Sequence, residues 1–113
     1  MHEMSIAMNI VDLAVETAKN NDAKKINSII LELGKLSGVV RDALEFCFAS
    51  ACKGTIAEGA ELEIIELKGM AHCSDCKLDF ETDQIVATCP ECNEYIFSVQ
   101  GGRELKIKSL NVD

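Results

Sequence analysis

Residues 73–92 read CSDCKLDFETDQIVATCPEC, and this stretch decides how the chain is organised. It holds two CxxC pairs, Cys73 with Cys76 and Cys89 with Cys92. Two residues between the cysteines of a pair let both thiolates reach one ion while the backbone turns tightly around it. Two such pairs supply four sulfurs, the closed tetrahedral set that a structural zinc prefers. The spacing therefore predicts a zinc site formed by these four cysteines.

Two other interpretations of the cysteines are a pair of disulfides and a redox-active CxxC. The opening residues MHEMSIAMN lack the basic flank and apolar stretch of a secretory signal. We therefore expect a cytoplasmic protein, in which cysteines stay reduced. A thioredoxin-like motif would place one CxxC at a strand–helix junction, and neither pair is predicted at one. The segment from 71 to 100 is also too poor in large apolar residues to build its own core, so a metal would make its folding favourable.

Outside the cysteine segment, helical and strand patterns alternate along the chain. They predict helices over residues 5–20 and from Val40 to Gly54, and strands over residues 26–33, 61–68 and 104–112. The last strand follows a break at Gly101–Gly102 and can rejoin the sheet of the first part. The predicted fold class is α+β, with two helices packed on a small mixed β-sheet and an inserted four-cysteine zinc-ribbon module. Residues 1–70 plus 101–113 would form one domain and residues 71–100 the other.

Several single residues receive predictions of their own. Ser5 is placed to cap the start of the first helix. Cys47 lies in the apolar stripe of the second helix and is predicted to be buried, whereas Cys52 lies near the end of that helix. Neither has a neighbouring base that would make it a nucleophile. His72 stands next to Cys73, but with four cysteines available we expect it to be a bystander or to support the zinc site from outside.

Composition and charge exclude some classes of function. The chain has 113 residues, of which 48% are hydrophobic, and its net charge is −8. Residues 71–100 hold one lysine against six acidic residues, and zinc bound to four thiolates adds about two further negative charges. A nucleic-acid-binding protein needs a basic face, so this role is not expected. No apolar run approaches the roughly 20 residues that cross a bilayer, so no membrane role is expected either.

The amino terminus carries a second, weaker metal motif. The chain begins Met1-His2-Glu3. An α-amine, amide nitrogens and an imidazole can together form a square-planar nitrogen set, the geometry that Ni(II) or Cu(II) favours. From these residues alone, a terminal histidine without a metal stays the commoner case. Because the chain contains no P-loop, GxSxG or HExxH sequence, it is not expected to be an enzyme of those classes.

The combination of motifs resembles the hydrogenase nickel-incorporation family HypA/HybF, over nearly the whole chain. The similar segments are Met1–Ser5, GKLSGV at 34–39, LEFCF at 44–48, GTIAEGAEL at 54–62 and the paired CxxC. The resemblance implies a nickel metallochaperone that serves the maturation of [NiFe]-hydrogenase, with some relatives also supplying urease, and that is no enzyme. Its partners would be the nickel-handling GTPase HypB and the large subunit of the hydrogenase, and it could form a homodimer.

The resemblance also implies which residues hold each metal. His2 would be the primary nickel ligand, joined by the Met1 amine and the backbone nitrogens of His2 and Glu3, with the Glu3 side chain as a further ligand or a tuning group. Ni(II) would be transient cargo and Zn(II) a structural cofactor. Two alternatives remain open: a zinc-ribbon adaptor for protein interactions without a nickel role, and a thiol oxidoreductase.

Overall fold

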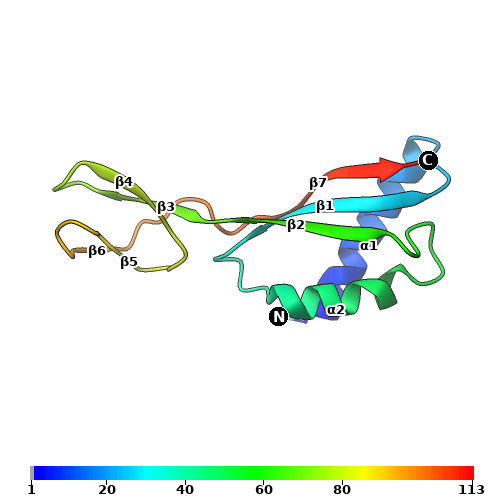
Figure 1. The fold of residues 1–113 in the computed structure, drawn as a ribbon, viewed down its shortest axis with the longest axis horizontal. Helices are drawn as coiled ribbons and strands as arrows, with labels where there is room; N and C mark the ends of the chain where they lie inside the picture. The colour runs from blue at the N-terminus through cyan, green and yellow to red at the C-terminus, as the bar shows by residue number, and fades with distance from the viewer. Residues whose placement is uncertain (1) are drawn as a thin grey trace.

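The computed structural model describes residues 2–113 and is elongated, about 54 × 25 × 16 Å (Figure 1). Its helices are α1 (Glu3–Asn20) and α2 (Arg41–Cys52). Its strands are β1 (Ile26–Gly34), β2 (Glu61–Leu67), β3 (Gly69–Cys73), β4 (Leu78–Thr82), β5 (Ala87–Thr88), β6 (Tyr95–Ile96) and β7 (Leu105–Val112).

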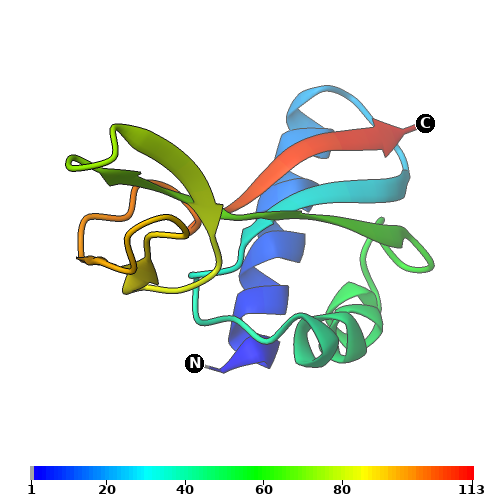
Figure 2. The same ribbon diagram turned by 60° about the vertical axis from the view of Figure 1, so that its left-hand side comes forward.

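Strand β1 is the centre of the main sheet, whose order is β2-β1-β7. β2 runs parallel to β1, and β7 runs antiparallel to it. The chain leaves this sheet after β2 and returns to it with β7, so the predicted return of the final strand is confirmed. α1 and α2 pack against the sheet (Figure 2), which confirms the α+β class with a small mixed sheet.

Helix α1 buries the stripe that its periodicity predicted. Its buried side chains recur at three- and four-residue spacing and face the sheet: Ala7, Ile10, Val11, Ala14 and Ala18. The predicted start was wrong, however. The helix begins at Glu3 with His2 as its N-cap, so Ser5 lies inside the first turn and caps nothing. The Ile6 N–H donates to the His2 carbonyl at 3.1 Å, which closes the first turn two residues earlier than expected.

Helix α2 turns a different set of side chains inward from the predicted one. Leu44, Phe48 and Cys52 are buried, because residues four apart lie nearly above one another on a helix. Cys47 lies about 60° around the helix from Leu44, and it is half-buried at the border of the core. The prediction that Cys47 is buried was therefore wrong, and Cys52, near the helix end, is the cysteine that the core encloses.

Three glycines lie where the two halves of the molecule meet. A Cβ atom at Gly34 would lie 2.0 Å from the carbonyl oxygen of Gly102, and one at Gly102 would lie 2.8 Å from the nitrogen of Gly69. The Leu36 N–H donates to the Gly102 carbonyl at 2.6 Å. At Gly101–Gly102 three backbone segments therefore cross in direct contact. Only glycine, which has no side chain, allows the backbones to approach this closely.

The other half of the molecule consists of two small hairpins. β3 pairs with β4, and β5 pairs with β6, each antiparallel. An isolated bridge between Met70 and Gln100 ties the two ends of this segment together. None of the helices in the described part of the chain combines the length and the apolar character needed to cross a lipid bilayer.

Candidate metal centres

Each CxxC pair sits at the tip of one hairpin. Cys73 pairs with Leu78 at the last rung of the β3–β4 ladder, and the first CxxC forms the turn between them. Thr88 pairs with Tyr95 at the last rung of the β5–β6 ladder, and the second CxxC lies in the connection between them. The two hairpins bring their tips together at the far end of the molecule from α1 and α2 (Figure 1).

The residue that follows each pair adopts a left-handed conformation. Lys77, after Cys76, has φ 52°, and Asn93, after Cys92, has φ 63°. In the second turn the Asn93 N–H donates to the Cys89 carbonyl, and the Cys89 N–H donates to the Glu94 carbonyl, both at 2.9 Å. These bends return the backbone on itself, so that both sulfurs of a pair face the same point.

The four sulfurs form one cluster. The Sγ atoms of Cys73, Cys76, Cys89 and Cys92 all lie within 4.8 Å of one another. The Sγ atoms of Cys73 and Cys92 are 3.6 Å apart. A tetrahedral zinc with bonds of about 2.3 Å separates its sulfurs by about 3.8 Å, so the donor set fits zinc in number, chemistry and spacing. Cys73 and Cys89 are buried, Cys76 is half-buried and Cys92 is exposed.

Electrostatics within the cluster favour a bound cation. Backbone N–H groups of Cys92 and Glu91 donate to the sulfur of Cys89 and lower the pKa of that thiol to about 7. Hydrogen bonding with Cys92 and the loss of water raise the pKa of the Cys76 thiol well above its ordinary value. One thiolate therefore forms readily, whereas further thiolates beside it need a positive ion. A bound zinc would supply that charge and hold the two hairpins together.

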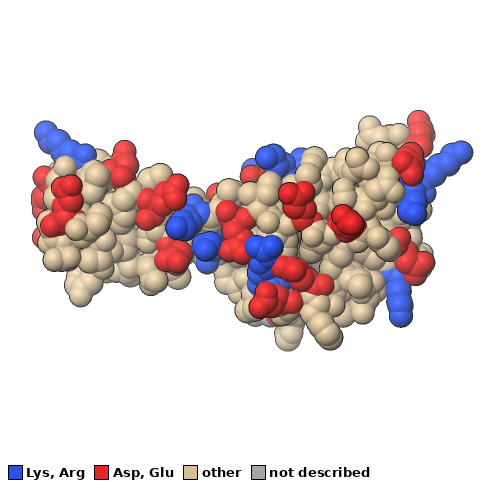
Figure 3. Space-filling model, in the orientation of Figure 1, with Lys and Arg blue, Asp and Glu red and all other residues tan. Residues whose placement is uncertain are grey.

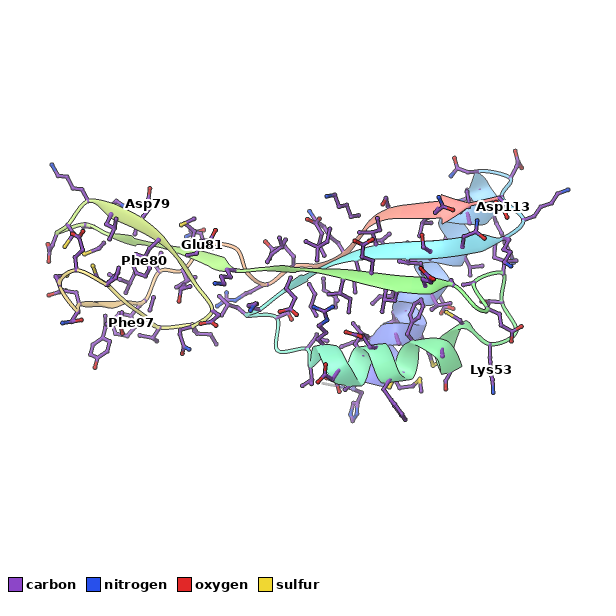
Figure 4. The ribbon with its side chains drawn as sticks, in the orientation of Figure 1. Lys53, Asp79, Phe80, Glu81, Phe97 and Asp113 are labelled. Atoms are coloured by element: carbon purple, nitrogen blue, oxygen red, sulfur yellow. The ribbon has the colours of Figure 1, made fainter. Side chains whose placement is uncertain are left out.

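His72 takes no part in the cysteine cluster. Side chains alternate across a strand, so His72 points to the opposite face of β3 from its neighbour Cys73. Its Nδ1 lies 2.6 Å from Oδ1 of Asp79 on β4 (Asp79 is labelled in Figure 4). The pair is exposed to solvent. His72 therefore lies outside the cluster that the four cysteines form.

The residues named for nickel lie in the other half of the molecule. Met1 lies outside the described residues. The side chain of His2 is exposed and makes no capping hydrogen bond. Oε2 of Glu3 accepts a hydrogen bond from the backbone N–H of Val40 at 3.4 Å, at the start of α2. Within the described part of the chain, the cysteines form the only cluster of three or more side chains suited to a metal, so any nickel set at His2 needs main-chain nitrogens.

A charged network close to Val40 was not foreseen from the sequence. Arg41 contacts Glu45 at 2.6 Å and Glu66 of β2 at 2.5 Å, and Lys35 lies 3.6 Å from Glu66. The hydrogen bond from Arg41 lowers the pKa of the Glu66 carboxyl. The spacing of Arg41 and Glu45 on one helix could have indicated their pair. No local pattern connects either residue to Glu66, which the parallel pairing of β1 and β2 brings into place.

The fold and the four-sulfur site define a small zinc-ribbon metal protein built on an α+β sheet domain. Over residues 1–112 the chain matches the family described as "Hydrogenase/urease nickel incorporation, metallochaperone, hypA". It is 41% identical over 113 residues to the hydrogenase maturation factor HypA of Chlorobaculum tepidum and also 41% identical to that of Geobacter sulfurreducens, with complete coverage of both chains in each case. The chain belongs to the HypA family of nickel-incorporation metallochaperones.

Solved structures agree in fold. The solution structure of the Ni metallochaperone HypA from Helicobacter pylori superposes with a TM-score of 0.68 at 24% identity, covering 99% of this chain and 97% of the other. A second solution structure of a HypA protein gives the same TM-score at 25% identity, covering 99% and 96%. The arrangement of helices, mixed sheet and cysteine-bearing hairpins is thus the arrangement of this family.

Proposed function

We propose that this chain binds Ni(II) at its amino terminus and delivers it for the maturation of [NiFe]-hydrogenase, while zinc at the four cysteines holds the ribbon in shape. The observation that carries the proposal is the exposed His2 at the N-cap of α1, in a chain of the nickel-incorporation family. Nickel is cargo here and is handed on unchanged, so the chain acts as a carrier and not as an enzyme.

The start of α1 suits main-chain coordination. The first N–H groups of a helix have no acceptor within it, and the Glu3 N–H is one of them. This nitrogen is therefore free to lose its proton to a bound metal without breaking a helical hydrogen bond. With the Met1 amine, the His2 nitrogen and the His2 imidazole, it would complete a planar nitrogen set. The Glu3 carboxylate would have to leave the Val40 N–H before it could join.

The coordination geometry and the ligand chemistry of the two sites explain how each would select its metal. Zinc has no preference for a square plane and is held well by four thiolates. Ni(II) gains from a planar set of nitrogens. An exposed terminal site with few ligands also releases its metal more easily than a closed sulfur cage, which suits a delivery protein. We assign residues 1–70 plus 101–113 to the nickel-binding domain and residues 71–100 to the zinc domain.

For partners, we propose the nickel-handling GTPase HypB and the hydrogenase large subunit, in the cytoplasm, with a homodimer as a further assembly. The ribbon is the acidic end: Figure 3 shows red side chains scattered over it with little blue among them. Its acidic residues are Asp75, Asp79, Glu81, Asp83, Glu91 and Glu94. We expect these charges to help bind one of the partners, so charge reversal at Glu91 and Glu94 should weaken binding, and unchanged binding would contradict this role.

The decisive experiment is nickel titration with X-ray absorption on the zinc-loaded protein and on His2→Ala. The wild type should show planar nitrogen and oxygen coordination, and His2→Ala should lose it. His72→Ala is the matched control, since His72 is the other histidine in the chain, and this variant should bind nickel normally. Sulfur ligation of nickel would overturn the assignment. Equal nickel uptake by wild type and His2→Ala in equilibrium dialysis would instead favour the zinc-ribbon adaptor without a nickel role.

A further inference from the structure

The outer edge of β7 is an unpaired edge of the main sheet. β7 is the last strand in the order β2-β1-β7, and it pairs with β1 on one side only, with a bulge at Lys108. Figures 1 and 2 show β7 as the last strand on that side of the sheet, with the end of α1 lying beside it. An edge of this length leaves backbone N–H and C=O groups free to pair with another extended segment.

Beside this edge lies an apolar groove between β7 and α1. Its volume is about 620 Å³, and its apolar lining includes Leu13 of α1 with Ile107, Leu110 and Val112 of β7. A smaller hollow of about 190 Å³ continues it towards the start of α1 and shares Leu13 and Ile107. Leu13 is 54% exposed and Val112 is 39% exposed, so the groove presents apolar surface to solvent along much of the strand.

The charge of the groove differs from the charge of the protein. Among the described residues that line the groove and its continuation, only Lys106 and Lys108 are charged. Lys106 lies 3.7 Å from Glu32 of the adjacent strand, whereas Lys108 makes no ion pair within the described residues. In a chain of net charge −8, this edge is therefore a basic strip beside an apolar groove.

Lysines on an edge disfavour pairing with a second copy of the same edge, because an antiparallel pair of β7 strands would bring the lysines of both copies together. The same lysines attract carboxylates. A strand alternates its side chains between two faces, so an added segment with apolar residues at every second position would place them in the groove and its other side chains beside the lysines.

We propose that the β7 edge and the α1–β7 groove bind an extended segment of a partner protein in which apolar and acidic residues alternate. The segment would join the sheet as a fourth strand, with its apolar side chains over Leu13 and Ile107 and its carboxylates beside Lys106 and Lys108. This surface lies in the sheet domain, apart from both the cysteine cluster and the acidic ribbon. It would allow one partner to be held there while the cysteine cluster stays accessible.

The test uses the complete zinc-loaded chain, labelled with ¹⁵N, and two short blocked peptides as probes. One peptide alternates Glu with Val, and the other alternates Lys with Val. The acidic peptide should shift the amide signals of β7 and of the Leu13 turn, and it should slow hydrogen exchange along β7. The basic peptide should bind at least about tenfold more weakly, because like charges then face one another.

Matched variants distinguish the loss of a binding contact from a general effect on the fold. Lys108→Glu should weaken binding of the acidic peptide about fivefold, whereas Lys53→Glu, the same change at the end of α2 (Lys53 is labelled in Figure 4), should leave it unchanged. Leu13→Ser should weaken it about tenfold. Phe46→Ser is its control, because Phe46 is an exposed apolar residue on the other helix. Amide spectra would confirm that each variant is folded.

Three outcomes would overturn the proposal. Equal binding of the acidic and basic peptides would remove the role of the lysines. Shifts confined to the ribbon would place the binding elsewhere. Dimerisation of the free chain through β7 would mean that a second copy occupies the edge.

Discussion

The carboxylate of Glu3 accepts a hydrogen bond from the backbone N–H of Val40 across 37 positions of the sequence, at 3.4 Å. The first turn of α1 thus supplies a negative charge to the start of α2. That charge interacts favourably with the N-terminus of α2, where the N-cap residue Val40 makes no side-chain capping hydrogen bond.

Replacing Glu3 by Gln should lower the free energy of unfolding by about 0.5–1 kcal/mol, because the amide brings no negative charge to the start of α2. Denaturant unfolding of the zinc-loaded protein measures this. Glu16→Gln, an exposed change on the same helix, should have little effect. If Glu3→Gln weakens the free energy of nickel binding by far more than it lowers the free energy of unfolding, the carboxylate also contributes to metal binding.

Gly34→Ala should be strongly destabilising, by about 3 kcal/mol or more, because its Cβ would meet the Gly102 carbonyl at 2.0 Å and the backbone cannot yield there. Gly38→Ala tests the opposite case. No atom lies within 4 Å of the added Cβ, but φ is +80°, so we expect a loss of only about 1 kcal/mol. Thermal unfolding of both variants measures the two losses of stability. Equal losses would show that the backbone around Gly34 moves to make room for the added Cβ.

Removing zinc should unfold residues 71–100 and leave the β2-β1-β7 sheet folded, since the core clusters lie in the helices and the main sheet. Hydrogen exchange before and after chelation measures this residue by residue. Cys73→Ser should reproduce the effect of chelation. Loss of protection throughout β1 would contradict the proposed division into two domains.

Alkylation should distinguish the cysteines. Burial raises the pKa of the Cys52 thiol, so in the zinc-loaded protein Cys47 should react with iodoacetamide before Cys52. After chelation the four zinc cysteines should all become reactive, because residues 71–100 are then expected to unfold and expose their sulfurs. Mass spectrometry of timed samples gives the order. Rapid alkylation of Cys52 in the native state would contradict this order, because it would show that the core opens easily.

Acid should weaken the contact between Glu66 and Arg41. Because Arg41 lowers the pKa of Glu66 below its unfolded value of about 4.3, the pair stabilises the fold above that pH. The contribution is lost as the pH falls through the lowered folded value. Glu66→Gln should therefore lower the free energy of unfolding at neutral pH. The free energy of unfolding of this variant should also fall less on acidification than that of the wild type. Glu63→Gln, an exposed change on the same strand, is the control, and identical curves for the two variants would exclude a role for the pair.

The zinc site and most elements of the fold could be predicted from the sequence because their signals are local. Spacing within each CxxC fixes the ligand chemistry, and the stripe from Ala7 to Ala18 fixes the buried face of α1. What was missed depends on contacts distant in sequence. His2 and not Ser5 occupies the N-cap position of α1, and Cys52 is buried in place of Cys47, because tertiary packing and not local preference sets a helix end and its rotation. The link between Arg41 and Glu66 needs the strand pairing itself.

The position of β7 has a consequence for how the protein is made. The central strand β1 emerges from the ribosome before the zinc-binding hairpins, but its antiparallel neighbour β7 follows them. One side of β1 therefore stays open until β7 has been synthesised, and the zinc-binding hairpins are synthesised before that gap closes. Metal capture by the nascent ribbon would bring Met70 and Gln100 together and shorten the loop that β7 must close, so the supply of zinc during synthesis can set how quickly the sheet is completed.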